Sequence, residues 1–174
     1  MSIRERSLMK LDNLNETMEF IRKIYTCEIP MFDEDGDDWT EEYSDFYDSL
    51  DDLIKDPGYF EVGCIPKLME LFNDTLNYDT LMSALADMVI NIACFYGKDG
   101  MHKLLESFVC VKVEGEMYGK MHLVGGLLQN HFEELKVALS TSTDEVRQEF
   151  KGILSVIEFK NLLNQKEELL KMLS

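Results

Sequence analysis

The residues best suited to chemistry in this sequence are the acids between Asp33 and Asp38, because clustered carboxylates are the ligands that Ca²⁺ prefers. An EF-hand loop requires glycine at its sixth position and glutamate at its twelfth. Counted from Asp33, these positions hold Asp38 and Ser44. The segment therefore does not match an EF-hand, and we expect at most weak binding of divalent cations there.

The histidines are the other candidate ligands, and they are His102, His122 and His131. Their spacing matches neither H-E-x-x-H nor any Cys/His pattern of a zinc site, so we expect structural or surface histidines. The sequence also lacks the G-x-S-x-G turn of a serine nucleophile and the G-x-x-x-x-G-K-[ST] phosphate-binding loop. These observations predict no catalytic residue, no cofactor and no metal ligand.

One enzymatic alternative lies in the acids that follow the run. Glu41, Asp45 and Asp48 could chelate a catalytic metal ion if a helix presents them together. This hypothesis would make the chain an enzyme with an unfamiliar acidic site.

Cysteine usage bears on the compartment in which the chain works. The sequence contains no C-x-x-C pair, which argues against a zinc ribbon or a thioredoxin-like redox motif. Cys94 and Cys110 lie among apolar residues, as small buried thiols do. The N-terminal residues carry charge where a secretory signal would be apolar, and no window is apolar enough to span a membrane. We therefore expect a cytoplasmic protein with reduced thiols and no membrane contact.

Net charge excludes one class of partner. The 174 residues include 34 acidic and 17 basic ones, which gives a formal net charge of −17. Because the phosphate backbone of a nucleic acid would be repelled, we expect no direct binding of DNA or RNA. The same field would accelerate the approach of a basic protein.

Most of this excess charge comes from one segment. Between Asp33 and Glu61 the only basic residue is Lys55, and Trp39, the only tryptophan of the chain, lies among the acids. Clustered acids keep a local field at cellular salt, where scattered ones are screened. The sequence thus predicts a partner-binding surface made of Asp33, Glu34, Asp35, Asp37, Asp38, Trp39, Glu41, Glu42 and Asp45. The alternative is a solvated loop followed by a polar helix face, with Trp39 folded into the core.

Hydrophobic periodicity predicts helices along most of the chain. The expected ranges are 14–25, 39–55, 66–73, 80–96, 100–108, 116–130, 132–139, 143–158 and 161–173. Capping boxes are expected at Asn13 with Glu16 and at Ser142 with Glu145. The helix over 80–96 is apolar over a wide arc and nearly free of charge, so we expect it at the centre, buried on more than one side. Its methionines, like Met69, are expected to fill the core.

The breaks between helices also carry information. Asp56, Pro57 and Gly58 should end the helix over 39–55, because the residue before proline avoids helical angles. Residues 109–113 alternate like a strand but have no convincing partner strand, so we interpret them as an extended connector. The glycines of the helix over 116–130 indicate close packing between helices.

Short connections between successive helices place them antiparallel. We therefore predict an all-α fold of stacked antiparallel helical hairpins, HEAT-like in architecture, in a single domain over 1–174. Residues 1–40 would supply an N-terminal helix and the acidic loop, and residues 41–174 the hairpin stack.

Four stretches within residues 44–174 resemble the immunity protein 30 family, the cytosolic partners of bacterial polymorphic toxins. These stretches are Phe46–Leu50, Ile65–Phe72, Leu81–Leu85 and Glu149–Leu154. The resemblance implies an all-helical, non-enzymatic inhibitor that binds a cognate toxin domain and blocks its active site or substrate groove. Many such toxins attack nucleic acids and are basic, so an acidic surface would occupy the cleft where phosphates lie.

Three functions thus follow from the sequence. The first is an immunity protein that neutralises a cognate, basic toxin, with its acidic surface guiding association. The second is a helical adaptor that recognises another protein through a groove lined by methionines and aromatic side chains. The third is the metal-dependent enzyme mentioned above.

Overall fold

The structure is a computed structural model that describes residues 13–25, 32–33, 35–36, 38–73, 79–109, 111, 118–158 and 160–174. Its α-helices are α1 (Leu14–Tyr25), α2 (Glu41–Lys55), α3 (Ile65–Met69), α4 (Asp79–Phe95), α5 (Gly97–Phe108), α6 (Tyr118–Asn130), α7 (Phe132–Ser140), α8 (Asp144–Val156) and α9 (Leu163–Met172). Short 3₁₀ turns lie at Pro57–Tyr59, Val62–Cys64 and Glu70–Asn73. Among the described residues there is no β-strand, so the predicted all-α class is confirmed.

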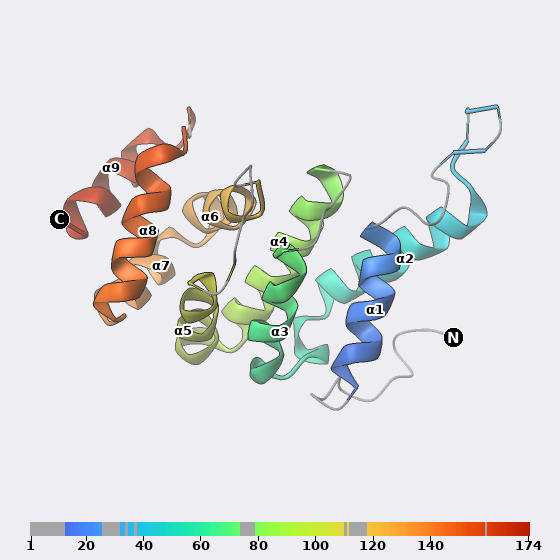
Figure 1. Ribbon diagram of the computed structural model, residues 1–174, viewed down its shortest axis with the longest axis horizontal. Coiled ribbons are helices and arrows are strands. Elements are labelled where there is room, and N and C mark those ends of the chain that lie inside the picture. The colour runs from blue at the N-terminus through green and yellow to red at the C-terminus, as the bar shows by residue number, and fades with distance from the viewer. Residues whose placement is uncertain are drawn as a thin grey trace.

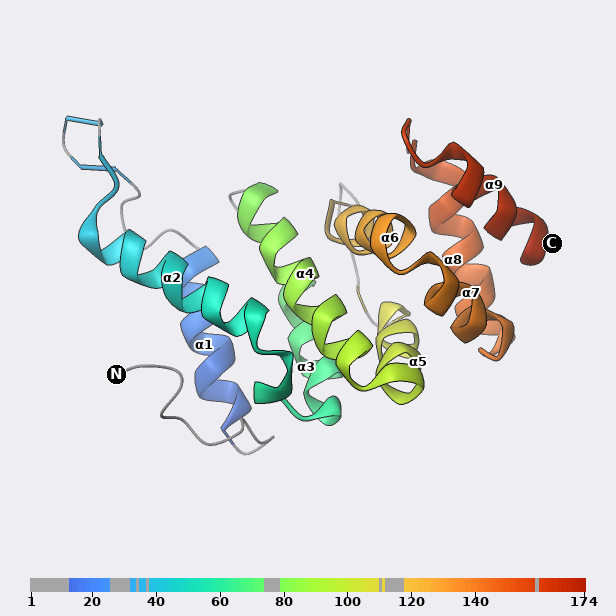
Figure 2. The same cartoon turned by 180° about the vertical axis from the view of Figure 1, so that it is seen from behind.

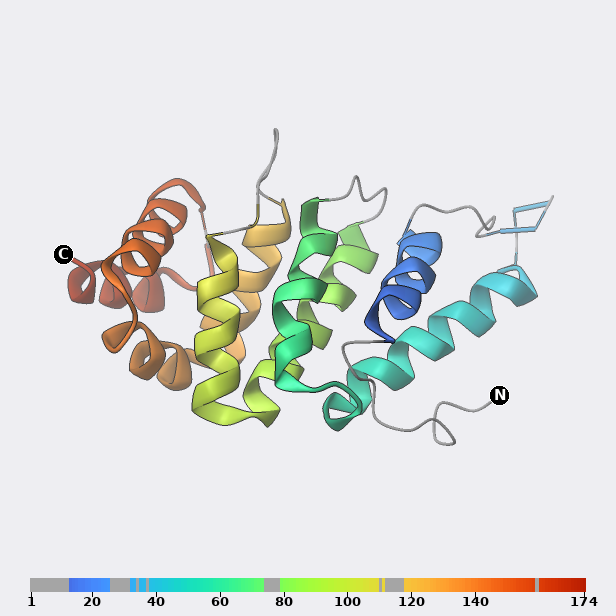
Figure 3. The same ribbon diagram turned by 60° about the horizontal axis from the view of Figure 1, so that its bottom comes forward.

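The helices lie along an elongated molecule (Figure 1). Helices α1 and α2 occupy one end, α8 and α9 occupy the other, and α3 to α6 lie between them. Figure 2 shows the same order from behind, and Figure 3 shows that the half of α2 nearer its N-terminus extends past α1. Buried side chains from α1 to α9 form one apolar cluster along this axis.

Helix α4 is the central element, as the sequence predicts. It packs against α2 and α3 as well as α5 and α6. Leu85, Met88 and Ile92 are fully buried, and so are Ala86 and Ala93 on other faces of the helix. A helix that is apolar around its circumference must be covered on several sides, which explains why four others surround it.

The join between α4 and α5 is tighter than predicted. Helix α5 begins at Gly97 rather than at residue 100, and only Tyr96 separates it from the end of α4 at Phe95. Gly97 has φ +59°, a left-handed conformation that glycine adopts without strain and that reverses the chain at once. The two helices then approach so closely at Gly100 that an added Cβ would lie 2.2 Å from the carbonyl oxygen of Ala93.

Side chains fix several other helix ends. The N-cap of α2 is Thr40, whose Oγ1 accepts from the backbone N–H of Tyr43 at 3.2 Å. At its other end α2 stops at Lys55, before Pro57, as expected. The Ile54 carbonyl accepts a hydrogen bond from Asn91 Nδ2 at 3.2 Å, which ties this end to α4.

The predicted capping box at Ser142 and Glu145 is wrong. The N-cap of α8 is Thr143, whose Oγ1 accepts from Val146 N at 3.4 Å. Ser142 instead donates its hydroxyl to the carbonyl of Ala138 at 2.8 Å, because it still belongs to the turn that closes α7.

Close packing accounts for two glycines of α6. A Cβ on Gly119 would lie 2.8 Å from the ring of Phe72, and one on Gly126 would lie 2.9 Å from Ile90 Cδ1. The interpretation of these glycines as contact points is therefore confirmed. The connector over 109–113 is described only at Val109 and Val111. Val109 has helical rather than extended angles there, because the last turn of α5 continues into it.

Gly100→Ala should lower the free energy of unfolding by about 2 kcal/mol or more, because its Cβ can be accommodated only if the backbones of α4 and α5 move apart. Gly152→Ala is the matched control. A Cβ at Gly152 meets nothing within 4 Å, so helix propensity alone should raise stability by about 0.5–1 kcal/mol. Urea unfolding of both variants checks the expectation, and equal effects would contradict the close approach at Gly100.

Candidate functional site

The acidic loop is a short hairpin held by its own backbone. Phe32 and Trp39 form an isolated antiparallel bridge, and Asp33 N donates to the carbonyl of Asp38 at 2.9 Å. Gly36, with φ +78°, turns the chain and donates its N–H to Asp33 Oδ1 at 2.7 Å. Asp33 thus uses its carboxylate to close the turn. Asp35 and Asp38 lie exposed on the same hairpin.

The hairpin leads directly into an acidic stripe on α2. We define this stripe as Glu41, Asp45, Asp48 and Asp52, which are all exposed. Their spacing of three and four residues places them on one side of the helix, opposite the buried side chains of Tyr43 and Leu50. The stripe is therefore continuous with the acids of the hairpin.

Three aromatic rings form a cluster at the start of α2. Trp39 meets Tyr43 edge-on with ring centroids 5.4 Å apart, and it meets Tyr47 at 5.6 Å. Tyr43 is only 7% exposed and Tyr47 is half-buried, whereas Trp39 is 52% exposed. Beside it, Phe32 is 46% exposed. The alternative that Trp39 is folded into the core is therefore wrong, because the cluster covers only part of its ring.

The structure brings together most of the residues that the sequence proposes for partner binding. Asp33, Asp35, Asp38, Glu41 and Asp45 are all exposed in the hairpin and at the start of α2. Two further proposed residues, Glu34 and Asp37, lie outside the described residues, and for Glu42 only the backbone within α2 is described.

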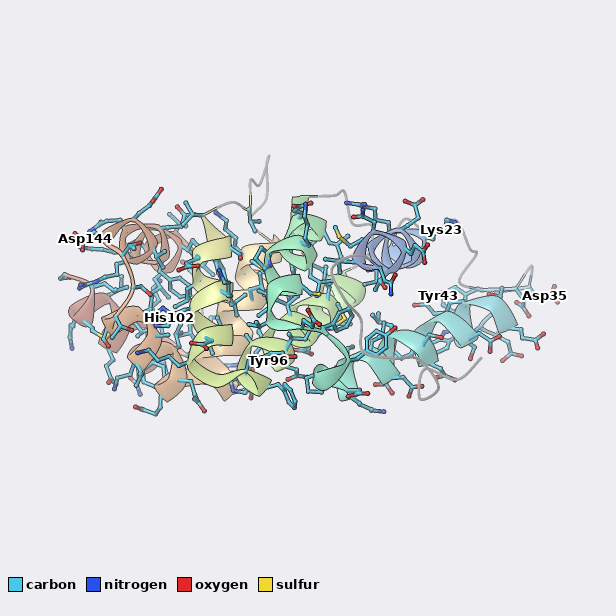
Figure 4. All side chains as sticks on the ribbon, turned by 90° about the horizontal axis from the view of Figure 1, so that it is seen from below. Lys23, Asp35, Tyr43, Tyr96, His102 and Asp144 are labelled. Carbon is cyan, nitrogen blue, oxygen red and sulfur yellow. The ribbon has the colours of Figure 1, made fainter. Side chains whose placement is uncertain are left out.

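Together the hairpin and the adjoining half of α2 form an arm, which we define as residues 32–33, 35–36 and 38–48. In Figure 4, Asp35 marks the far end of this arm and Tyr43 its helical part, while Lys23 lies on α1. From Ile24 to Ile54 the sequence contains no lysine, arginine or histidine. The arm thus presents carboxylates and aromatic rings without basic residues of its own.

The metal-site alternative finds no support here. Within the described part of the chain, no three His, Cys, Asp or Glu side chains lie close enough to hold a metal ion. Glu41, Asp45 and Asp48 share a face of α2, but successive carboxylates along a helix point outward into solvent rather than toward one centre. The arrangement suits long-range attraction better than chelation.

A pocket that the sequence does not predict lies between the end of α4, the start of α5 and α7. Its volume is about 440 Å³, within the range of small-ligand and side-chain pockets. Its lining is Cys94, Gly97, Lys98, Met101, Glu133, Glu134, Val137 and Ala138. Two stretches of the chain that are distant in sequence, 94–101 and 133–138, build it, which is why sequence spacing gives no signal for it.

Two histidines hold the walls of this pocket together. His131, which directly precedes α7, places its Nδ1 3.3 Å from Sγ of Cys94 on α4. His102 on α5 places its Nε2 3.0 Å from Oγ1 of Thr141, the residue that directly follows α7. These contacts join α7 to α4 and to α5. His102 and His131 are thus half-buried at contacts between helices.

The environment of Cys94 suppresses its nucleophilicity. Burial raises the pKa of the Cys94 thiol to about 11, and the nearby charge of Glu134 acts in the same direction. A thiol with this pKa is protonated at neutral pH, and the protonated form is a poor nucleophile. The Cys94–His131 contact thus joins a protonated thiol to the residue that precedes α7. Cys64 is also buried, while Cys27 and Cys110 lie outside the described residues.

No protein-family model, curated protein or solved structure matches the chain. In the described part of the chain, none of the helices combines the length and the apolar character needed to cross a membrane. A function for the chain must therefore be inferred from the chemistry of the arm and of the pocket.

In a variant that keeps Cys94 as its single cysteine, alkylation by iodoacetamide at pH 8 should be on the order of 100-fold slower in the folded chain than in urea. The reason is the pKa difference between about 11 and the ordinary 9.0, which lowers the thiolate fraction. The rate should rise as pH increases toward 11. Glu134→Gln should lower this pKa and speed the reaction, whereas Glu145→Gln on α8 should not. Equal rates in folded and unfolded chains would contradict the assignment.

Proposed function

We propose that the chain is a non-enzymatic immunity protein that binds and neutralises a cognate, basic bacterial toxin domain in the cytoplasm. In this proposal its helices form a HEAT-like stack of antiparallel hairpins, and the arm approaches the toxin first. The resemblance to the immunity protein 30 family motivates the biological role. The surface chemistry of the arm motivates the mode of binding.

The observation that carries the proposal is the charge of the arm, which has exposed carboxylates and no basic residue. Exposed carboxylates continue from Asp35 and Asp38 in the hairpin to the acidic stripe on α2. Such a field accelerates encounter with a basic surface, by a factor between about 10 and 1,000. An exposed tryptophan, the residue type most enriched at binding hot spots, lies within the same surface.

This surface also suits the chemistry of the proposed partner. A toxin that attacks nucleic acid has a basic groove that receives phosphates. Carboxylates arranged along a helix would occupy that groove with the same sign of charge as the substrate. Inhibition would then follow from exclusion of the substrate, without any reaction on the toxin.

Co-expression with the protein encoded by the neighbouring gene tests the role itself. The expected result is rescued growth together with a stable complex of the two proteins. A toxic neighbour that remains toxic and does not bind the chain would contradict the immunity role.

Asp45→Lys with Asp48→Lys should slow association with the toxin by about tenfold or more and weaken its dependence on salt, because the change reverses the field of the arm. Glu158→Lys with Glu167→Lys is the matched control. These two residues are exposed at the opposite end of the molecule, and their reversal changes the net charge by the same amount. Stopped-flow association rates at several salt concentrations check the expectation. Equal slowing by both pairs would assign the effect to net charge rather than to the arm.

A second candidate function, a helical adaptor, is favoured by the pocket between α4, α5 and α7. The buried Met101 and Ala138 lie in its apolar lining, while Val137 is 60% exposed at its rim. A partner's apolar side chain would fit this volume.

If the pocket is the principal binding site, Val137→Asp should weaken partner binding by at least about tenfold, because a carboxylate at the rim must be desolvated. Val156→Asp is the control, since Val156 is 65% exposed on α8 and does not line the pocket. Under the immunity proposal both variants should retain full toxin affinity. Calorimetric titration separates the two functions.

A further inference from the structure

From the geometry of the aromatic cluster we infer that the exposed face of Trp39 is a docking platform for an arginine side chain of a basic protein partner. The inference rests on the proposed function, in that it names the chemistry by which the arm would hold such a partner. The cluster consists of Trp39, Tyr43 and Tyr47.

The platform is held in place before any partner arrives. The rings of Tyr43 and Tyr47 support Trp39 from the helix, with all three centroid distances between 5.4 and 6.3 Å. On the other side the backbone of Trp39 pairs with Phe32 across the hairpin. A large side chain fixed in this way loses little conformational entropy when a ligand stacks on it. About half of the Trp39 surface nevertheless remains open.

The charge around the platform selects a cation. Asp35 and Asp38 precede Trp39 in the hairpin, while Glu41 and Asp45 lie on the side of α2 opposite Tyr43 and act on the platform through the field of the arm rather than by contact. The opposing influence is the N-terminus of α2, which is equivalent to roughly half a positive charge. Because each carboxylate carries a full negative charge, the local field remains negative. The basic residues nearest in sequence do not belong to the arm, since Lys23 lies on α1 and Lys55 ends α2 (Figure 4).

The combination of a flat ring and carboxylates favours a guanidinium over an ammonium group. Guanidinium is planar and weakly hydrated, so it can stack on the indole face and still direct N–H donors to neighbouring carboxylates. An ammonium group is strongly hydrated and gains mainly the Coulombic attraction. An uncharged apolar side chain would gain the ring contact but would have to desolvate carboxylates without pairing them. Arginine alone satisfies both features of the surface.

Because Trp39 is the only tryptophan, its fluorescence reports on the platform directly. The experiment titrates the full chain with blocked nonapeptides of arginine or of lysine at equal salt. Oligoarginine should shift the emission of Trp39 and bind about three- to tenfold more tightly than oligolysine. Asp35→Asn with Asp38→Asn should weaken both peptides, and oligoarginine should remain the tighter ligand, because its stacking on Trp39 persists.

Trp39→Leu, measured by calorimetry, should reduce the ratio of the two affinities to about one. Phe95→Leu is the matched control, since Phe95 is an exposed aromatic residue at the end of α4, outside the arm, and the ratio should survive its replacement. Circular dichroism establishes that both variants fold. A ratio near one in the native chain, or an unchanged ratio in Trp39→Leu, would overturn the inference.

The outcome separates this inference from the immunity role. If the native chain binds oligoarginine and oligolysine equally but reversal of Asp45 and Asp48 slows toxin association, the platform is rejected and the proposed function stands. If selectivity depends on Trp39 while the neighbouring toxin is neither bound nor neutralised, the platform stands and the immunity role is rejected.

Discussion

The burial of α4 on several sides is the constraint on which the rest of the structure depends. Burying one large apolar side chain contributes about 1.5–3 kcal/mol, and α4 buries Leu85, Met88, Val89, Ile90 and Ile92. Asp87 is the one charged residue in the middle of this helix. Asp87 is exposed, on the side of the helix that its neighbours leave open; partial desolvation still raises the pKa of its carboxyl, while His122 on α6 opposes the rise. The helix thus accepts almost no charge because neighbours cover it on most sides.

Helix α4 also places both candidate surfaces. Asn91 donates a hydrogen bond to the carbonyl of Ile54 and so fixes the C-terminal end of α2. The arm begins at the other end of this helix. One turn further along α4, Cys94 contacts His131 and lines the pocket. The arm extends from α2 at one end of the molecule, whereas the α5 and α7 residues that line the pocket lie on elements toward the other end (Figure 1). A partner that used both would have to span the body of the molecule between them.

Local pattern was enough to predict most helices, since amphipathic periodicity follows directly from what each helix buries. Leu14, Met18 and Ile21 are buried as their spacing requires. One error falls where two neighbouring residues compete for one structural role. Ser142 and Thr143 can both cap α8, and the turn after α7 takes Ser142 first.

The candidate sites were predictable to different degrees. The acids of the arm could be found from sequence because their clustering is itself local. The exposure of Trp39 could not be found, because it depends on how far α2 extends beyond the core. Trp39 lies just before α2, whose N-terminal half extends past α1, whereas Leu50 lies further along the helix and is buried in the core. The sequence carries no pattern for the pocket, because α7 meets α4 and α5 only in the folded chain.

The acidic stripe is costly for the free protein, which bears on why it exists. Carboxylates three or four residues apart on a helix repel one another, at about 0.2–0.5 kcal/mol for each pair. Asp52 also lies near the negative end of the helix dipole, and in the described part of α2 only the ion pair between Asp51 and Lys55 offsets this charge. The burial of Leu50 and Leu53 outweighs the repulsion and keeps the helix folded. Stability alone would not favour such a surface. A cationic partner would remove the repulsion on binding, so the energy that destabilises the free arm would become part of the affinity of the complex.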